Sequence, residues 1–116
     1  MKTWMTLLLK YAMTFVAGFL TLYLIDGNSV LEVLAIALAL TALNYILGDL
    51  MILPATNNLI ASIADGLMAA LVTYIIALIF PAITVSFLSL LILGVLIAAA
   101  EYFLHIYLMA SHEVAP

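Results

Sequence analysis

The chain has 116 residues, of which 70% are hydrophobic and 7% are charged, with a formal net charge of −4. A water-soluble domain has roughly 25% charged residues, so this composition excludes a soluble domain and indicates helices that face lipid. The negative charge excludes a nucleic-acid-binding surface, and the absence of cysteine excludes disulfides and thiolate metal sites.

Turn residues divide the first half of the chain into two apolar stretches. The first membrane span is expected over residues 4–25, before a turn cluster of sequence Asp-Gly-Asn-Ser. Ser29, with Glu32 three residues later, forms a capping-box pattern that starts the second helix. That span is expected over residues 31–53 and to stop at Pro54, because proline inside a helix removes a hydrogen bond.

The second half of the chain also contains two apolar stretches. Asn57 or Asn58 is expected to cap the third span, over residues 59–80, and the fourth span is expected over residues 84–109. Each stretch is long enough to cross roughly 30 Å of hydrocarbon at 1.5 Å per residue. The sequence therefore predicts an all-α polytopic membrane protein, with one domain (residues 1–116) of four transmembrane helices in an up-down bundle.

The positive charges of the chain indicate how it is oriented. Lys2 and Lys10 are the two basic residues, and both lie toward the N-terminal end. The positive-inside rule then places both termini and the loop at residues 54–58 in the cytoplasm. The predicted localisation is a cell membrane, crossed several times, with both termini cytoplasmic.

Ionisable residues inside the predicted spans lie at a similar depth. In the predicted topology, each span contains at least one ionisable residue near its cytoplasmic end. At a rise of 1.5 Å per residue, these residues lie within roughly 6–12 Å of the cytoplasmic face. These residues are Lys10, Asp49, Asp65, Glu101 and His105. An ionised side chain near the bilayer centre costs on the order of 2.5–3.5 kcal/mol, so this polar layer is a candidate functional site.

Helical periodicity gives each ionisable residue a stripe of small residues, which let membrane helices approach closely. Three of these stripes run through Lys10, Asp65 and Glu101. In the second span, the expected stripe is Ala35, Ala39, Ala42, Ile46 and Asp49. The periodicity therefore predicts that the ionisable side chains face one another.

The charges of the layer do not balance. If all its members are ionised and His105 is neutral, three carboxylates stand against Lys10, a surplus of two negative charges. A site of low dielectric does not tolerate that surplus, so bound protons or a bound cation are expected. Two other interpretations stay open: Lys10 snorkels to the interface, and Asp49 and Asp65 lie near headgroup level or cap helix ends.

Glu101 and His105, four residues apart, face the same way and are weak candidates for sharing a metal ion. A catalytic zinc site needs three protein ligands, and Asp49 or Asp65 is available as the third. Apart from this possible cation, no cofactor is expected. No nucleophile–base–orienter set, phosphate loop or H-E-x-x-H motif is present, so no catalytic residue is predicted and enzymatic activity is disfavoured.

Three asparagines are expected to support the layer. Asn44 is expected to form a hydrogen bond between helices. Asn57 and Asn58 supply polar groups in the short loop before the third span.

The stretch at residues 48–54 (GDLMILP), followed by Asn57, Asn58 and residues 61–65 (ASIAD), resembles the YndM-like (DUF2512) family of small bacterial membrane proteins. Residues 101–105 (EYFLH) are similar to the last-helix pattern of that family. The resemblance implies a four-span protein of the bacterial cell membrane and no established chemistry.

Two functions are compatible with these residues. In the first, the polar layer binds a proton or a cation and couples it to transport. In the second, the protein is structural or accessory, and the layer is a clasp that only holds the helices together. Small multidrug transporters are comparable in size, but their essential carboxylate lies in the first helix, where this chain has Lys10. The expected partners are the lipid bilayer and further copies of the same chain.

Overall fold

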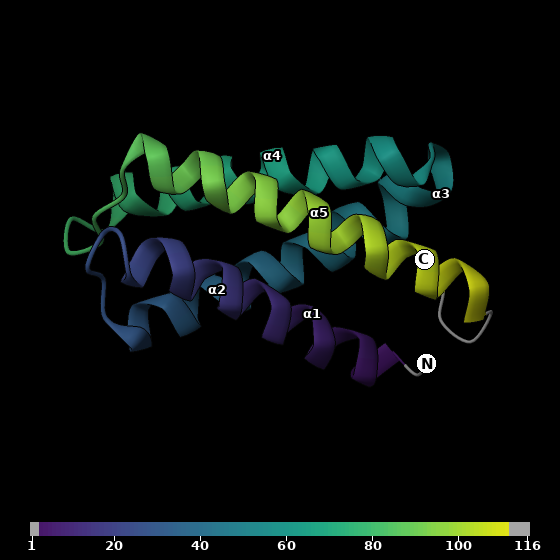
Figure 1. The fold of residues 1–116 in the computed structure, drawn as a ribbon, viewed down its shortest axis with the longest axis horizontal. Helices are drawn as coiled ribbons and strands as arrows, with labels where there is room; N and C mark the ends of the chain where they lie inside the picture. Colours follow the sequence, from purple (N-terminus) through teal and green to yellow (C-terminus); the bar gives the residue numbers. More distant parts are fainter. Residues whose placement is uncertain (1–2, 112–116) are drawn as a thin grey trace.

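The structure, a computed structural model, describes residues 3–111 and is all-α over that range, without strands. Four of its helical segments are long and apolar enough to cross a membrane. They are Thr3–Tyr23, Val30–Ala55, Asn58–Ile79 and Phe87–Tyr107. Successive helices run in opposite directions, as Figure 1 shows, so the predicted up-down arrangement of four membrane-spanning helices is confirmed.

The first two spans each combine more than one type of helix. The elements, in chain order, are α1 (Thr3–Gly18), η1 (Phe19–Tyr23), α2 (Val30–Leu43), η2 (Asn44–Ile52), α3 (Leu53–Ala55), α4 (Asn58–Ile79) and α5 (Phe87–Ser111). The elements η1 and η2 are π-helical, with backbone hydrogen bonds from residue i to i+5. The start of α1, the end of α5 and the turn after α3 lie at the same end of the bundle (Figure 1).

Two helix starts follow the capping patterns of the sequence. Glu32 N–H donates to Ser29 Oγ at 3.1 Å, and Ser29 N–H donates to Glu32 Oε1 at 2.9 Å, which completes the predicted capping box of α2. Ile60 N–H donates to Asn57 Oδ1 at 2.9 Å, so Asn57 is the N-cap of α4 and Asn58 is its first residue. These bonds satisfy backbone donors that a helix leaves free at its start.

The second span extends past the expected stop at Pro54, because helical backbone continues to Ala55. Pro54 lies at the start of α3, the short α-helical segment that follows η2. Proline is tolerated in the first turn of a helix, where its missing N–H has no intrahelical partner to lose. Pro54 is therefore the next-to-last residue of the helical backbone, which ends at Ala55.

Small residues bring α4 and α5 close together. A Cβ atom added at Gly66 would collide with the backbone carbonyl oxygen of Gly94 and would lie 3.0 Å from the Cβ of Ala98. Glycine at these positions permits the close backbone approach that stabilises helix pairs in lipid. The buried apolar core continues from this contact to the first two helices. It includes Ala17, Leu22, Val33, Ile36, Leu40, Ala69, Leu93 and Ile97.

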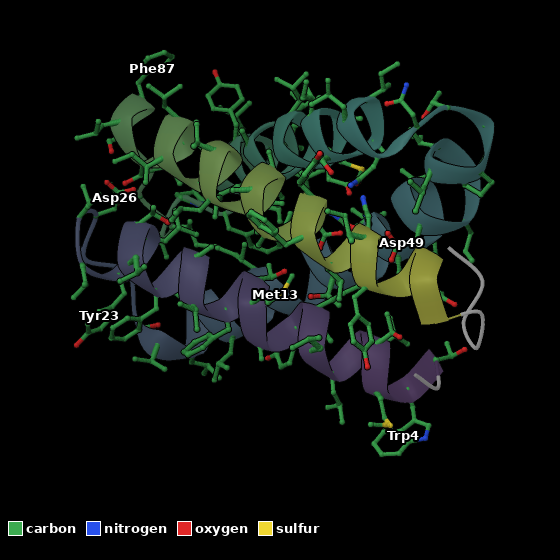
Figure 2. The ribbon with its side chains drawn as sticks, turned by 45° about the vertical axis from the view of Figure 1, so that its right-hand side comes forward. Trp4, Met13, Tyr23, Asp26, Asp49 and Phe87 are labelled. Carbon is green, nitrogen blue, oxygen red and sulfur yellow. The ribbon has the colours of Figure 1, made fainter. Side chains whose placement is uncertain are left out.

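A buried asparagine ties two loops together at the end of the bundle remote from the termini. Asn28 Nδ2 donates to the carbonyl oxygens of Leu22 at 2.9 Å and Thr84 at 2.6 Å, and its Oδ1 accepts from Thr84 N–H at 2.8 Å. Beside it, Ser86 N–H donates to Asp26 Oδ2 at 3.2 Å. Figure 2 shows Asp26 at the opposite end of the bundle from Asp49.

Candidate functional site

Five ionisable side chains lie together inside the bundle, toward the end that carries the termini. We call them the polar cluster: Lys10, Asp49, Asp65, Glu101 and His105. Each is at most 1% exposed. They come from α1, η2, α4 and α5, so each of the four spans contributes. These are the same five residues that the sequence placed in one layer.

Lys10 lies inside the cluster and does not reach the interface. Its Nζ lies 2.5 Å from Glu101 Oε2 and 2.9 Å from Asp49 Oδ2, and it donates to Asn44 Oδ1 at 2.7 Å. At 1% exposure the ammonium has no water shell of its own, so these three oxygens replace it. The snorkelling interpretation of Lys10 is therefore wrong, and Asn44 forms the interhelical hydrogen bond expected of it.

Three carboxylates converge on one nitrogen of His105. Its Nε2 lies 3.1 Å from Asp49 Oδ1, 3.1 Å from Glu101 Oε2 and 3.4 Å from Asp65 Oδ2. A ring nitrogen offers either one N–H or one lone pair, so it cannot form a strong hydrogen bond with all three carboxylates. The arrangement concentrates negative charge around a single point.

The other nitrogen of His105 is held by an amide. Nδ1 lies 2.9 Å from Asn58 Oδ1 and 3.3 Å from Ser62 Oγ. Asn58 is itself oriented, because its Nδ2 donates to the carbonyl oxygen of Tyr102 at 2.9 Å and its Oδ1 accepts from Ser62 Oγ at 3.1 Å. Assigned from this network, Nδ1 carries a hydrogen and donates to Asn58. Nε2 is then the nitrogen that faces the carboxylates with a lone pair when the ring is neutral.

Asp65 is the carboxylate with the fewest partners. Neither of its oxygens accepts a hydrogen bond, although the residue is completely buried. Its Oδ1 occupies the space where a Cβ at Gly48 would lie. Asp49 is also completely buried, and neither aspartate caps the start of α3 or α4, whose N-cap residues are Ile52 and Asn57.

The π-helix η2 turns Asp49 toward the cluster. The buried residues of η2 are Asn44, Gly48 and Asp49. In an α-helix, a residue five positions on lies about 140° around the axis. Because the π-helix bonds residue i to i+5, it brings Asn44 and Asp49 onto one face.

The predicted stripe of the second span is therefore wrong. Ala35, Ala42 and Ile46, which an α-helical period aligns with Asp49, are exposed on the outside of the bundle. The buried face of α2 instead consists of Val33, Ile36, Ala37, Leu40 and Thr41.

The contacts of two supporting residues were not predicted from the sequence. Ser62 contacts both His105 and Asn58, and Gly48 makes room for Asp65. The available signals were the spacing of Asn58 and Ser62, four residues apart on α4, and a glycine directly before Asp49 within an apolar helix. Asn57 acts at the exposed start of α4, where its side chain accepts from a backbone N–H of the first turn.

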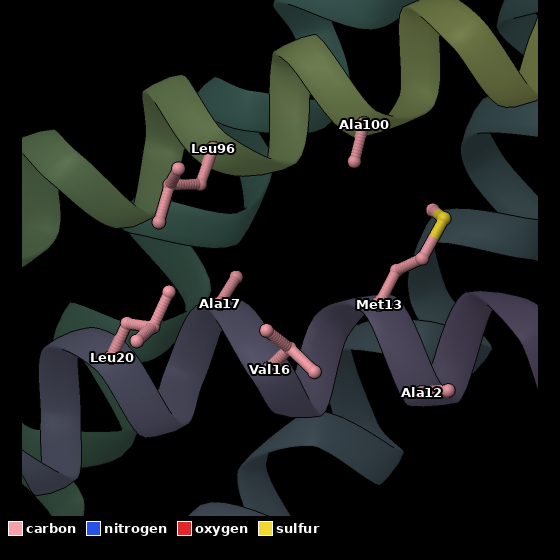
Figure 3. Close-up of a pocket in the computed structure, with 7 residues that line it drawn as sticks. All are labelled: Ala12, Met13, Val16, Ala17, Leu20, Leu96 and Ala100. Atoms are coloured by element: carbon pink, nitrogen blue, oxygen red, sulfur yellow. The ribbon is translucent and has the colours of Figure 1, made fainter.

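An apolar groove follows the seam between α1 and α5. It has a volume of about 360 Å³, and its lining includes Met13, Ala17, Leu96 and Ala100. Figure 3 shows these side chains pointing from the two helices into the gap between them. Because the side chains of the lining are apolar, the groove offers no ligand to an ion.

Four residues of the polar cluster lie close enough together to bind one metal ion. Asp49, Asp65, Glu101 and His105 can each present one ligand atom, and these atoms all lie within 4.8 Å of one another. Carboxylate oxygen and imidazole nitrogen are common ligands of divalent metal ions. The cluster can therefore either neutralise its charges internally or surround a cation.

Comparison with known proteins gives a family and one named relative. The profile of the family described as "Protein of unknown function (DUF2512)" matches residues 1–114. The chain is 33% identical over 112 residues to the "Uncharacterized membrane protein YndM" of Bacillus subtilis (strain 168). The match covers 96% of this chain and 63% of that relative, so the chain spans less than two thirds of the length of the relative. No solved structure matches the chain.

Proposed function

The chain belongs to the DUF2512 family of unknown function, and we propose that its polar cluster binds a cation within the membrane, either a proton or a metal ion. The convergence of three buried carboxylates on His105 Nε2 carries this proposal. In the described part of the chain, this is where buried carboxylates lie closest together, and a positive charge placed between them would reduce their mutual repulsion. The named relative supports a membrane location and supplies no activity.

The charge of the cluster supports the same conclusion. Lys10 offsets one of the three carboxylates, which leaves two negative charges when His105 is neutral and one when it is an imidazolium. Removing an ion from water costs several kcal/mol even after the protein relaxes. A bound cation lowers this cost by bringing the net charge of the cluster closer to zero.

Occupancy of this site is coupled to the packing of the whole bundle. Each of the four spans contributes a side chain to the cluster, so adding or removing a cation changes contacts between all of them. A ligand shifts a conformational equilibrium when it binds two states with different affinity. On this basis we propose that cation binding is linked to transport across the membrane.

The alternative function is that of a clasp. The contacts of Lys10 with Asp49 and Glu101 tie α1 to η2 and α5, and they do so without any further ion. A clasp of this kind would stabilise the fold of a structural or accessory membrane protein. It does not account for Asp65, which is buried without a hydrogen bond.

A binding measurement separates the two functions. The full-length protein, in lipid nanodiscs, is titrated with protons and with metal ions, and Glu101→Gln is compared with Glu32→Gln. Glu32 lies in the capping box of α2, where glutamine preserves the cap. Cation binding that is lost in Glu101→Gln and kept in Glu32→Gln supports the proposal. Unchanged binding in both variants, with a less stable fold for Glu101→Gln, supports the clasp.

We also infer that the end of the bundle carrying the termini faces the cytoplasm. The two basic residues of the chain, Lys2 and Lys10, belong to that end of the sequence, which is what the positive-inside rule requires. Lys2 lies outside the described residues, and Lys10 is buried, so the inference rests on their positions in the chain.

A further inference from the structure

We propose that the cation is a divalent first-row transition-metal ion, held by Asp49, Asp65, Glu101 and His105 Nε2. The proposal rests on the cation-binding function above and names the class of ion. Its first support is the spacing of the ligand atoms: three carboxylate oxygens lie 3.1, 3.1 and 3.4 Å from Nε2, and all four atoms lie within 4.8 Å of one another. For metal–ligand bonds of about 2.1 Å, neighbouring ligands lie roughly 3.0 Å apart in an octahedron and 3.4 Å apart in a tetrahedron.

The second support is the orientation of His105. Histidines that bind metals usually donate the hydrogen of their other nitrogen to a fixed acceptor, which directs the lone pair at the ion. Here Nδ1 donates to Asn58 Oδ1 at 2.9 Å, and Asn58 is fixed by its bond to the carbonyl oxygen of Tyr102. The lone pair of Nε2 in this tautomer points at three carboxylates, an arrangement that is repulsive until a positive charge lies between them.

The third support is the incomplete bonding of Asp65. Its two oxygens accept no hydrogen bond, and the residue is completely buried. A buried carboxylate that accepts no hydrogen bond is costly, and buried polar groups are normally satisfied. The glycine at position 48 leaves room for this carboxylate beside Asp49. Asp65 Oδ2, which lies 3.4 Å from His105 Nε2, therefore keeps its lone pairs beside the other three ligands.

Charge distinguishes a divalent ion from one monovalent ion and from a single proton. With Lys10 ionised and His105 neutral, the cluster carries two negative charges, and a divalent ion brings it to zero. A monovalent ion or a single proton leaves one negative charge inside the membrane. Ligand chemistry narrows the class further, because imidazole favours zinc, iron and nickel while carboxylates also accept manganese.

The test uses the full-length protein in nanodiscs after treatment with a chelator. It is titrated with Zn²⁺ by calorimetry and with Mn²⁺ by electron paramagnetic resonance, with ¹⁵N-labelled histidine. We expect one ion per chain, in contact with one histidine nitrogen. Asp65→Asn should weaken binding more than about 100-fold, and Asn58→Leu, which removes the positioning bond, about 10–100-fold with a weaker nitrogen coupling.

Two matched controls keep the test specific. Glu32→Gln removes a carboxylate from the capping box, and His112→Gln removes the second histidine of the chain, so both should bind as the unchanged protein does. The nitrogen coupling is read on the unchanged protein and needs no variant to fold. Absence of a stoichiometric ion, a signal without nitrogen coupling, or equal losses in the controls would overturn the proposal. Proton or monovalent-cation binding that still depends on Glu101 would leave the broader function standing while this proposal fails.

Discussion

Lys10 Nζ and Glu101 Oε2 lie 2.5 Å apart although their positions in the chain are 91 residues apart. The contact joins α1 to α5, the first and last spans of the bundle. Because both side chains are buried, neither can turn to water if the other is lost. The pair is therefore a sensitive point of the fold as well as part of the polar cluster.

Replacing Lys10 with methionine should destabilise the protein strongly. Removing one partner of a buried ion pair costs about 3–5 kcal/mol, because the other charge stays buried and uncompensated. Thermal unfolding in detergent measures the loss. The double variant Lys10→Met with Glu101→Gln should be more stable than Lys10→Met alone, since it removes one of the stranded carboxylates. A double variant less stable than the single one would contradict this prediction.

Replacing Gly48 with alanine should disturb the cluster directly. The new Cβ would occupy the position of Asp65 Oδ1, so that carboxylate must move. Overpacking of this kind costs about 1–3 kcal/mol, and we expect weaker cation binding with it. Gly66→Ala is the matched control, because its Cβ meets the Gly94 backbone on the α4–α5 contact. It should lower stability and leave the cation affinity of the folded protein unchanged. Equal loss of affinity in both variants would argue against a specific role of Gly48.

Replacing Asn28 with alanine should loosen the end of the bundle remote from the cluster. The change leaves the backbone N–H and carbonyl groups of Thr84 without their partner. Thr84 is exposed, so water can replace the lost partner, and each lost hydrogen bond costs about 0.5–1.5 kcal/mol. Hydrogen exchange at the Thr84 amide should accelerate, while exchange near Glu101 stays slow. Asn57→Ala, which removes an exposed N-cap worth about 1 kcal/mol, should leave Thr84 exchange unchanged.

Single cysteines can determine the orientation of the bundle, because the chain has none of its own. Thr56 directly follows α3, and Phe87 begins α5 at the opposite end of the bundle; both side chains are exposed. With the termini in the cytoplasm, a membrane-impermeant maleimide added to intact cells should label Phe87→Cys at once. Thr56→Cys should react only after lysis. The reverse pattern would place the termini outside.

Features that depend on local chemistry could be predicted from the residues alone. Composition identified a membrane protein, turn residues separated the four spans, and the pattern of Ser29 and Glu32 fixed the start of α2. Counting residues from the cytoplasmic end of each predicted span also placed Lys10 and Glu101 at a similar depth in the membrane. These features could be predicted because hydrophobicity, capping and rise per residue act within one segment of chain.

The directions and contacts of the side chains at that level depend instead on how the four helices pack. Asp49 faces the cluster because η2 is a π-helix. Counting residues with a regular α-helical period places the Asp49 side chain on the wrong face of the helix. The burial of Lys10, the amide that orients His105 and the space that Gly48 leaves for Asp65 all depend on residues from other helices. The physical reason is that a buried charge takes its partners from across the bundle, and those partners are far away in the sequence.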